Sequence, residues 1–88
     1  MRVNTQNVFK AWKEGRSCRK RRSIWTADGI IYSYSTRIMH RNHMGQIVLN
    51  MEKYSPTTSN HQNGLRQLLV SDDSVTCFLT IDKPQTIL

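Results

Sequence analysis

The cations gathered near the start of the chain are the side chains best suited to chemistry with a partner. The first 22 residues carry eight lysines and arginines against one acid, Glu14, whereas the rest of the chain carries five of each sign, so the net charge of +7 lies at one end. Guanidinium groups bind phosphate through paired N–H donors, and ammonium groups bind it as point charges. Charge segregated in this way creates a directed field that attracts a polyanion or an acidic protein surface.

Aromatic rings stand close to these cations in the sequence and offer faces on which bases can stack. Trp25 comes shortly after the run, and tryptophan and arginine often dominate the binding energy at protein surfaces. Tyr32 and Tyr34 share one face of the predicted strand with Ile30, which favours core packing for both rings. The alternative for the basic residues at 16–22 is a solvated surface loop that binds no partner. The residues that we expect to contact nucleic acid or another partner are Lys13, Arg16, Arg19, Lys20, Arg21, Arg22 and Trp25.

The histidines and acids offer little for metal binding or catalysis. His40 and His43 form one weak ligand pair, whereas structural zinc usually needs paired ligands in both halves of its motif. A Ser59–His61 pair would need an orienting carboxylate, and the nearest acids, at 72–73, lie at the far end of the same predicted helix. Without an activated nucleophile or a phosphate-binding loop, we expect no metal, no cofactor and no catalytic residue, and a protein that is not an enzyme.

Length and cysteine content limit the class of protein. At 88 residues, 38% of them hydrophobic, the chain is long enough for one domain. The opening MRVNTQ is not followed by the apolar stretch of a secretion signal, and no window approaches the ~20 apolar residues of a membrane span. We expect a soluble, cytoplasmic protein that keeps its thiols reduced, with Cys18 at the surface and Cys77 in the core.

Two helices are expected. The first has Asn4 or Thr5 as its cap and ends at Gly15, and its apolar stripe comprises Val8, Phe9, Ala11 and Trp12. The second follows Pro56, and Ser59 with Gln62 three residues later is typical of a capping box. Its buried stripe comprises Leu65, Leu68 and Leu69.

His61 lies one helical turn before Leu65 and shares its apolar face. We expect a core histidine that is hydrogen-bonded to the backbone or to a neighbouring hydroxyl group, with Ser55, Thr57, Thr58 and Ser59 as the available hydroxyl groups. An anion held by the N–H groups of the helix N-terminus is the alternative.

Strands are expected on either side of the second helix, with turns at Ala27–Gly29 and Asn42–Gly45. The predicted strands are Ser23–Thr26, Ile30–Thr36 with Arg37–Arg41 extending it, Gln46–Tyr54 with Ile47, Leu49 and Met51 inward, and Val75–Ile81 with Val75, Cys77, Leu79 and Ile81 on one face. This order predicts an α+β fold: a small antiparallel sheet of about four to five strands with two helices packed on one face. Residues 1–82 form the single domain, with a basic loop at 16–22, and 83–88 form a short tail.

Two stretches together resemble a family of small, uncharacterised tailed-phage and prophage proteins. The first reads YSYSTRI over residues 32–38 and the second YSPTTSNHQ over residues 54–62, against the family patterns YSYxTxI and YSxTTxxHQ. The resemblance covers about residues 5–70; Met39 and the heavy basic cluster depart from the pattern. It implies a phage origin and assigns no activity. We interpret the second motif as one that locks the second helix onto the sheet through Tyr54, Thr57, Thr58, Ser59, His61 and Gln62.

Charge and resemblance together favour a phage-encoded, non-catalytic binding protein. We expect it to contact nucleic acid through the basic patch, alone or within a ribonucleoprotein. The alternative is an inhibitor of a host defence complex, for example a CRISPR effector, that docks the patch on an acidic protein surface. Salt separates the two, because each phosphate that a protein neutralises releases counterions and makes binding steeply salt-dependent.

Overall fold

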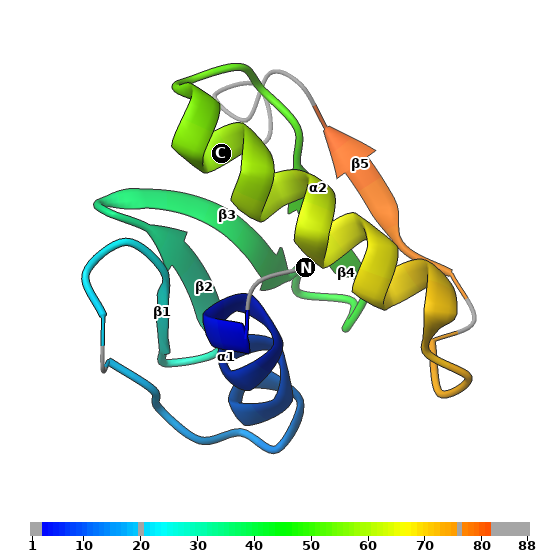
Figure 1. Cartoon of the computed structure of the whole chain (residues 1–88). Helices are drawn as coiled ribbons and strands as arrows, with labels where there is room; N and C mark the ends of the chain where they lie inside the picture. The colour runs from blue at the N-terminus through cyan, green and yellow to red at the C-terminus, as the bar shows by residue number, and fades with distance from the viewer. Residues whose placement is uncertain (1–2, 20, 76, 82–88) are drawn as a thin grey trace.

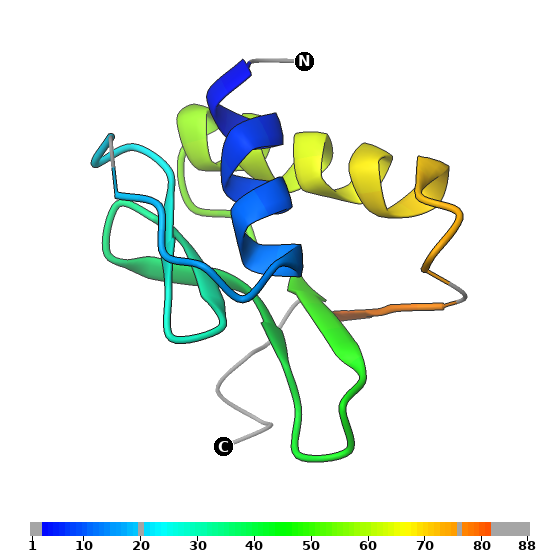
Figure 2. The same ribbon diagram turned by 90° about the horizontal axis from the view of Figure 1, so that it is seen from below.

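The computed structural model describes residues 3–19, 21–75 and 77–81, which form two helices and a five-stranded sheet (Figure 1). The strands lie in the order β1-β2-β3-β4-β5, and every pair is antiparallel except β4–β5. Both helices pack on one face of the sheet (Figure 2), which confirms the predicted α+β fold. The elements are α1 (Val3–Lys13), β1 (Trp25–Ala27), β2 (Ile30–Ser33), β3 (Thr36–Arg41), β4 (Ile47–Asn50), α2 (Pro56–Ser71) and β5 (Leu79–Ile81).

Helix α1 buries the predicted stripe and ends where the sequence predicts. Gly15 has φ 76°, and the next residue, Arg16, donates its backbone N–H to Ala11 at 2.8 Å, so the last carbonyls of the helix are satisfied by a glycine-dependent turn. The predicted cap is wrong: Asn4 and Thr5 lie inside the helix, which already includes Val3. The buried members of the stripe are Val8, Phe9, Ala11 and Trp12.

The first hairpin forms at the predicted turn. Asp28 and Gly29 have φ values of 55° and 80°, the pair of positive angles whose twist matches that of two antiparallel strands. The loop before β1 also runs beside this hairpin, because Cys18 exchanges two 2.9 Å backbone hydrogen bonds with Thr26.

The predicted strand Ile30–Thr36 is in fact two strands. The chain turns at Tyr34, which has φ 56°, so that Ser33 pairs with Thr36 and β3 returns beside β2. The predicted facing is also wrong: Ile31 and Ser33 are fully buried, whereas Tyr34 is 50% exposed.

A bulge in β3 adds one residue to the core. The β2–β3 register shifts between Ile31 and Tyr32, because Ile31 opposes Met39 whereas Tyr32 opposes Arg37. Ile38 is the extra residue, and both it and Met39 are completely buried.

Strand β4 is shorter than predicted and is covered on both sides. All four residues from Ile47 to Asn50 are buried. Val48 and Asn50, which were expected to face solvent, are therefore also covered. Met51, predicted to point inward, is partly buried against the core.

Helix α2 begins with a different cap from the one predicted. The Ser55 hydroxyl accepts the backbone N–H of Thr58 at 3.2 Å, whereas Ser59 lies within the helix and Gln62 bonds elsewhere, so no capping box forms. The predicted apolar stripe is present, with Leu65 and Leu69 buried and Leu68 partly buried.

The last strand and the cysteines differ from the predictions. Strand β5 covers only Leu79–Ile81 and pairs with β4 in parallel, because α2 crosses over between them. Cys18 packs against the core, whereas Cys77 is exposed, the reverse of the expected placement; both are free thiols. The predicted tail, 83–88, lies outside the described residues.

Candidate functional site

An open hollow of about 450 Å³ lies between the loop that precedes β1 and the turn between β2 and β3. We call it the basic hollow. The bridge between Cys18 and Thr26 holds the loop beside β1 and so brings its arginines next to the turn. The lining residues are Arg19, Arg21, Arg22, Trp25, Tyr34 and Ser35.

Trp25 is part of the support of the basic hollow. Its ring stacks on Tyr32, with centroids 4.0 Å apart and planes at 10°. The Arg19 guanidinium lies over the same ring, 5.0 Å from the centroid of Trp25. Because Tyr32 covers one face of the ring, Arg19 covers the other. The indole N–H donates to the carbonyl of Tyr34 at 2.7 Å. Both faces of Trp25 are therefore occupied, and a base could stack on it only by displacing Arg19.

Tyr34 is the exposed aromatic residue of the basic hollow. Half of it is exposed, and its backbone is held by the bond from Trp25 and by its own N–H, which donates to Ser23 at 3.2 Å. An aromatic residue with φ 56° is a backbone outlier, and such strain is common at binding sites. The alternating sequence pattern predicted Tyr34 in the core, because it concealed the turn at this residue.

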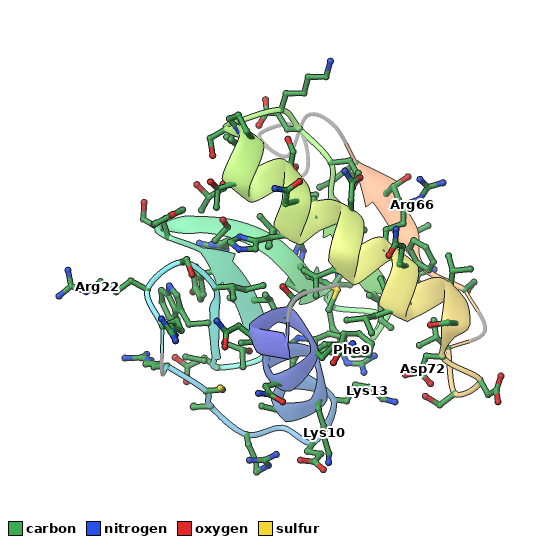
Figure 3. All side chains as sticks on the ribbon, viewed as in Figure 1. Phe9, Lys10, Lys13, Arg22, Arg66 and Asp72 are labelled. Carbon is green, nitrogen blue, oxygen red and sulfur yellow. The ribbon has the colours of Figure 1, made fainter. Side chains whose placement is uncertain are left out.

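The predicted basic patch is divided between two sides of the molecule. Lys13 forms an ion pair with Asp72 at the end of α2, and Figure 3 shows it directed there, with Arg22 on the opposite side. Arg16 forms an ion pair with Glu14, two positions earlier in the sequence. The structure thus brings only Arg19, Arg21 and Arg22 of the predicted cations to the basic hollow, and Lys20 lies outside the described residues.

The ion pairs also explain the shifted carboxyl groups. The hydrogen bond from Lys13, with further bonds from Ser74, lowers the pKa of Asp72 to about 2. The hydrogen bond from Arg16 lowers the pKa of Glu14. By contrast, Arg19, Arg21 and Arg22 form no ion pair with any carboxylate in the described part of the chain, so their charge remains available to a partner.

A second hollow, of about 510 Å³, lies at the other end of the β1–β2 hairpin, and we call it the β3 hollow. Arg37, His40 and Arg41 line it from β3, opposite the Asp28–Gly29 turn. The end of α1 and the turn after it complete the lining, with Trp12, Lys13 and Gly15. Burial, with the nearby charge of Arg37, lowers the pKa of His40. Nothing in the sequence pattern predicted this group, because residues 23–88 carry no net charge.

The Arg41 end of the β3 hollow is fixed by Trp12. The guanidinium of Arg41 lies 4.6 Å from the centroid of the Trp12 ring, whose N–H donates to the carbonyl of Gly29 at 2.8 Å. Arg37 is exposed, as Arg41 is, and no aromatic ring among the described side chains holds its guanidinium.

The motif at residues 54–62 forms a buried polar network between α2 and the sheet. Ser33 Oγ lies 2.9 Å from both Thr58 Oγ1 and His61 Nδ1, and Thr58 also accepts from Ser55 at 3.2 Å. His61 is therefore a core histidine bonded to a hydroxyl group, as predicted, but this hydroxyl group belongs to Ser33 of β2 and not to residues 55–59. Thr57 and Ser59 are half-buried beside this network.

Gln62 joins α2 to the end of β4, and Tyr54 forms bonds within the segment that connects the two. Gln62 Nε2 donates to the carbonyls of Asn50 and Glu52 at 2.7 and 2.9 Å. The Tyr54 hydroxyl donates to Glu52 at 2.6 Å and accepts from Asn50 at 2.9 Å. Burial, followed by the bond to Glu52, raises the pKa of Tyr54.

Metal and membrane features can be stated for the described part of the chain. His40 lies in β3 and His43 in the following turn, and the described residues contain no group of three or more potential metal ligands. Neither described helix has the length and apolar content needed to cross a membrane.

Comparison with known proteins identifies one match. A family model described as a family of unknown function (DUF8033) matches residues 3–76. The matched range contains both hollows and the network around His61. No curated protein and no solved structure matches the chain.

Proposed function

The chain belongs to the family of unknown function DUF8033, and we propose that it is a non-catalytic protein that binds nucleic acid through the basic hollow, alone or within a ribonucleoprotein. One observation carries this proposal. Three arginines without a carboxylate partner in the described chain surround a half-exposed tyrosine.

The chemistry of the basic hollow suits a phosphate chain with bases attached. Arginine binds phosphate oxygens through two parallel hydrogen bonds, and Tyr34 offers a ring on which a base of any identity can stack. Backbone contacts and stacking carry little sequence information, so this binding is sequence-tolerant. The burial of His61 and its bond to Ser33 support a structural role for the best catalytic candidate of the sequence.

A phage origin is part of the same proposal. The resemblance of residues 32–38 and 54–62 to tailed-phage and prophage proteins supports it. The protein then acts in the cytoplasm of the host cell, where host and phage nucleic acids are both within reach.

The test is a fluorescence-anisotropy titration of labelled single-stranded DNA, duplex DNA and structured RNA at low and physiological salt. Wild type is compared with an Arg21→Gln/Arg22→Gln variant. The matched control is Lys10→Gln/Arg66→Gln, which removes the same charge from exposed positions on the helices. For a single strand, loss of two phosphate contacts lowers the slope of log K against log salt by about 1.4. Equal binding by the two variants contradicts the proposal.

An acidic surface on a host defence complex is the second candidate partner. The exposed Tyr34 among arginines favours it, because tyrosine and arginine are common anchors of protein interfaces. If none of the three nucleic acids binds, the nucleic-acid proposal fails. Deletion of the gene should then lower phage fitness on defended hosts; unchanged fitness removes the defence candidate as well.

A further inference from the structure

The face of the sheet opposite the helices carries a row of aromatic and cationic side chains. Ser33 points towards α2, where it contacts His61, so Tyr32 next to it points to the opposite face. Trp25 and Arg37 are the direct partners of Tyr32 in the neighbouring strands, and directly opposed residues share a face. The row therefore runs from Arg19 over Trp25 and Tyr32 to Arg37.

The two hollows lie at opposite ends of the hairpin that carries this row. Trp25 lines the basic hollow, and Asp28, three residues further along the chain, lines the β3 hollow. Three residues of extended chain span roughly 10 Å. About three nucleotides of stacked strand, at roughly 3.4 Å each, cover the same length.

The β3 hollow has the charge to hold a phosphate. Arg37 and Arg41 form no ion pair with a carboxylate in the described ranges. Lys13, which also lines the β3 hollow, is already paired with Asp72. Asp28 is the acid in its lining, so the two arginines leave it positive.

We propose that Arg37 forms a second phosphate site and that a single strand of nucleic acid runs from the basic hollow to the β3 hollow across the Trp25–Tyr32 stack. This inference rests on the proposed function, because it takes nucleic acid as the partner. It adds a direction, a length and a strandedness to that function.

Single strands fit this path better than a duplex does. The bases of a duplex are already stacked and paired, so Tyr34 would contribute nothing to its binding, whereas an unpaired base can leave the strand and stack on the ring. The cations also lie in two hollows with the half-buried Trp25–Tyr32 stack between them, a path that a flexible strand can follow.

The test uses Arg37→Gln, with Arg66→Gln as the matched control. Arg66 is an exposed arginine of α2 and lines neither hollow (Figure 3). Labelled oligothymidylates of roughly two and roughly ten nucleotides are titrated by anisotropy; at roughly 3.4 Å per stacked nucleotide, the first is too short to reach the β3 hollow from the basic hollow and the second spans both. Circular dichroism melts verify that each variant is folded.

We expect Arg37→Gln to weaken binding of the longer strand about tenfold and to lower its salt slope by about 0.7. Binding of the shorter strand, which occupies the basic hollow alone, should change no more than in Arg66→Gln. The longer strand should also bind more tightly than a duplex of equal length.

The outcomes separate this inference from the proposed function. If Arg21→Gln/Arg22→Gln loses binding but Arg37→Gln behaves like Arg66→Gln, the second site is refuted and the proposed function stands. Tighter binding of the duplex refutes the single-stranded path alone. If no nucleic acid binds the wild type, both fail together.

Discussion

Replacing Tyr34 by glycine and by alanine separates the stability of its turn from the binding that we propose. Tyr34 is the first central residue of a two-residue turn between the paired residues Ser33 and Thr36, and it has φ 56°. A positive φ at this place favours glycine. Alanine and glycine both remove the ring, so the difference between the two variants isolates the backbone.

The magnitude follows from two opposing effects. A left-handed conformation costs a residue with a Cβ about 1–2 kcal/mol, and glycine loses about 0.5–1 kcal/mol through the greater freedom of its unfolded chain. We expect the free energy of unfolding of Tyr34→Gly to exceed that of Tyr34→Ala by about 0.75 kcal/mol, the difference between the midpoints of the two effects. Urea titrations followed by tryptophan fluorescence measure this difference, with equal m-values as the control.

Binding should respond differently from stability. Stacking on an aromatic side chain contributes about 1–3 kcal/mol per base, so both variants should bind a single strand about tenfold more weakly or worse. Tyr34→Phe keeps the ring and should bind like the wild type. Equal stability of the glycine and alanine variants would refute the account of the turn. Wild-type affinity in Tyr34→Gly would refute the place of Tyr34 in the interface.

Three further predictions concern the interactions that hold the helices. Gln62→Met leaves the two β4-end carbonyls without their donor and should lower the free energy of unfolding by about 2 kcal/mol in urea titrations; an unchanged midpoint contradicts the role of Gln62. Ser33→Ala removes a partner from both Thr58 and His61 and should cost about 1–2 kcal/mol, whereas Ser35→Ala, at an exposed position, should cost little. The pKa of Asp72 is lowered from 3.8 to about 2, so its stabilising effect is complete above the ordinary pKa and is lost as pH falls through 2. Melts of Asp72→Asn from neutral to acid pH should show a lower Tm at pH 7 and a shallower decline in acid than the wild type.

The features that the sequence predicted correctly depend on residues close together in the chain. The end of α1 needs only its apolar stripe and Gly15, whose φ of 76° permits the closing turn. The Asp28–Gly29 turn needs only two residues that tolerate positive φ. Such signals lie within a few positions and do not depend on tertiary contacts.

The facing of β2 could not be predicted in this way. Ile30, Tyr32 and Tyr34 are more apolar than the alternating set that contains Ser33, so hydrophobicity indicated the wrong face. Burial of Ser33 is favourable because Thr58 and His61, 25 and 28 positions away, both approach to 2.9 Å. A partner this distant in the sequence leaves no local signal.

The cap of α2 was predicted wrongly for a similar reason. Ser59 and Gln62 have the spacing of a capping box, but the amide of Gln62 is bonded to the carbonyls at the end of β4. Ser55 therefore caps the helix. Sequence spacing identified the residue types that begin a helix, and the tertiary contact of Gln62 decided which serine acts as the cap.

The candidate site was predicted in part for electrostatic reasons. Charge segregation drew attention to the basic loop, and three of its arginines do line one hollow. Lys13 was included with them, although Asp72, 59 positions away, holds it at the other side of the molecule. Arg37 was left out, because only the pairing of β3 with β2 places it beside Tyr32.

The two motifs that resemble phage proteins meet at one contact, and that contact connects the fold to the proposed interface. Ser33 belongs to the first motif and His61 to the second, and their bond anchors the last residue of β2. The next residue is Tyr34, whose strained turn must be held from both sides. The Ser33 side chain holds it from the core, and Trp25 holds its carbonyl from the surface. A motif that contains no cation and lies outside both hollows therefore positions the exposed ring on which we expect a base to stack.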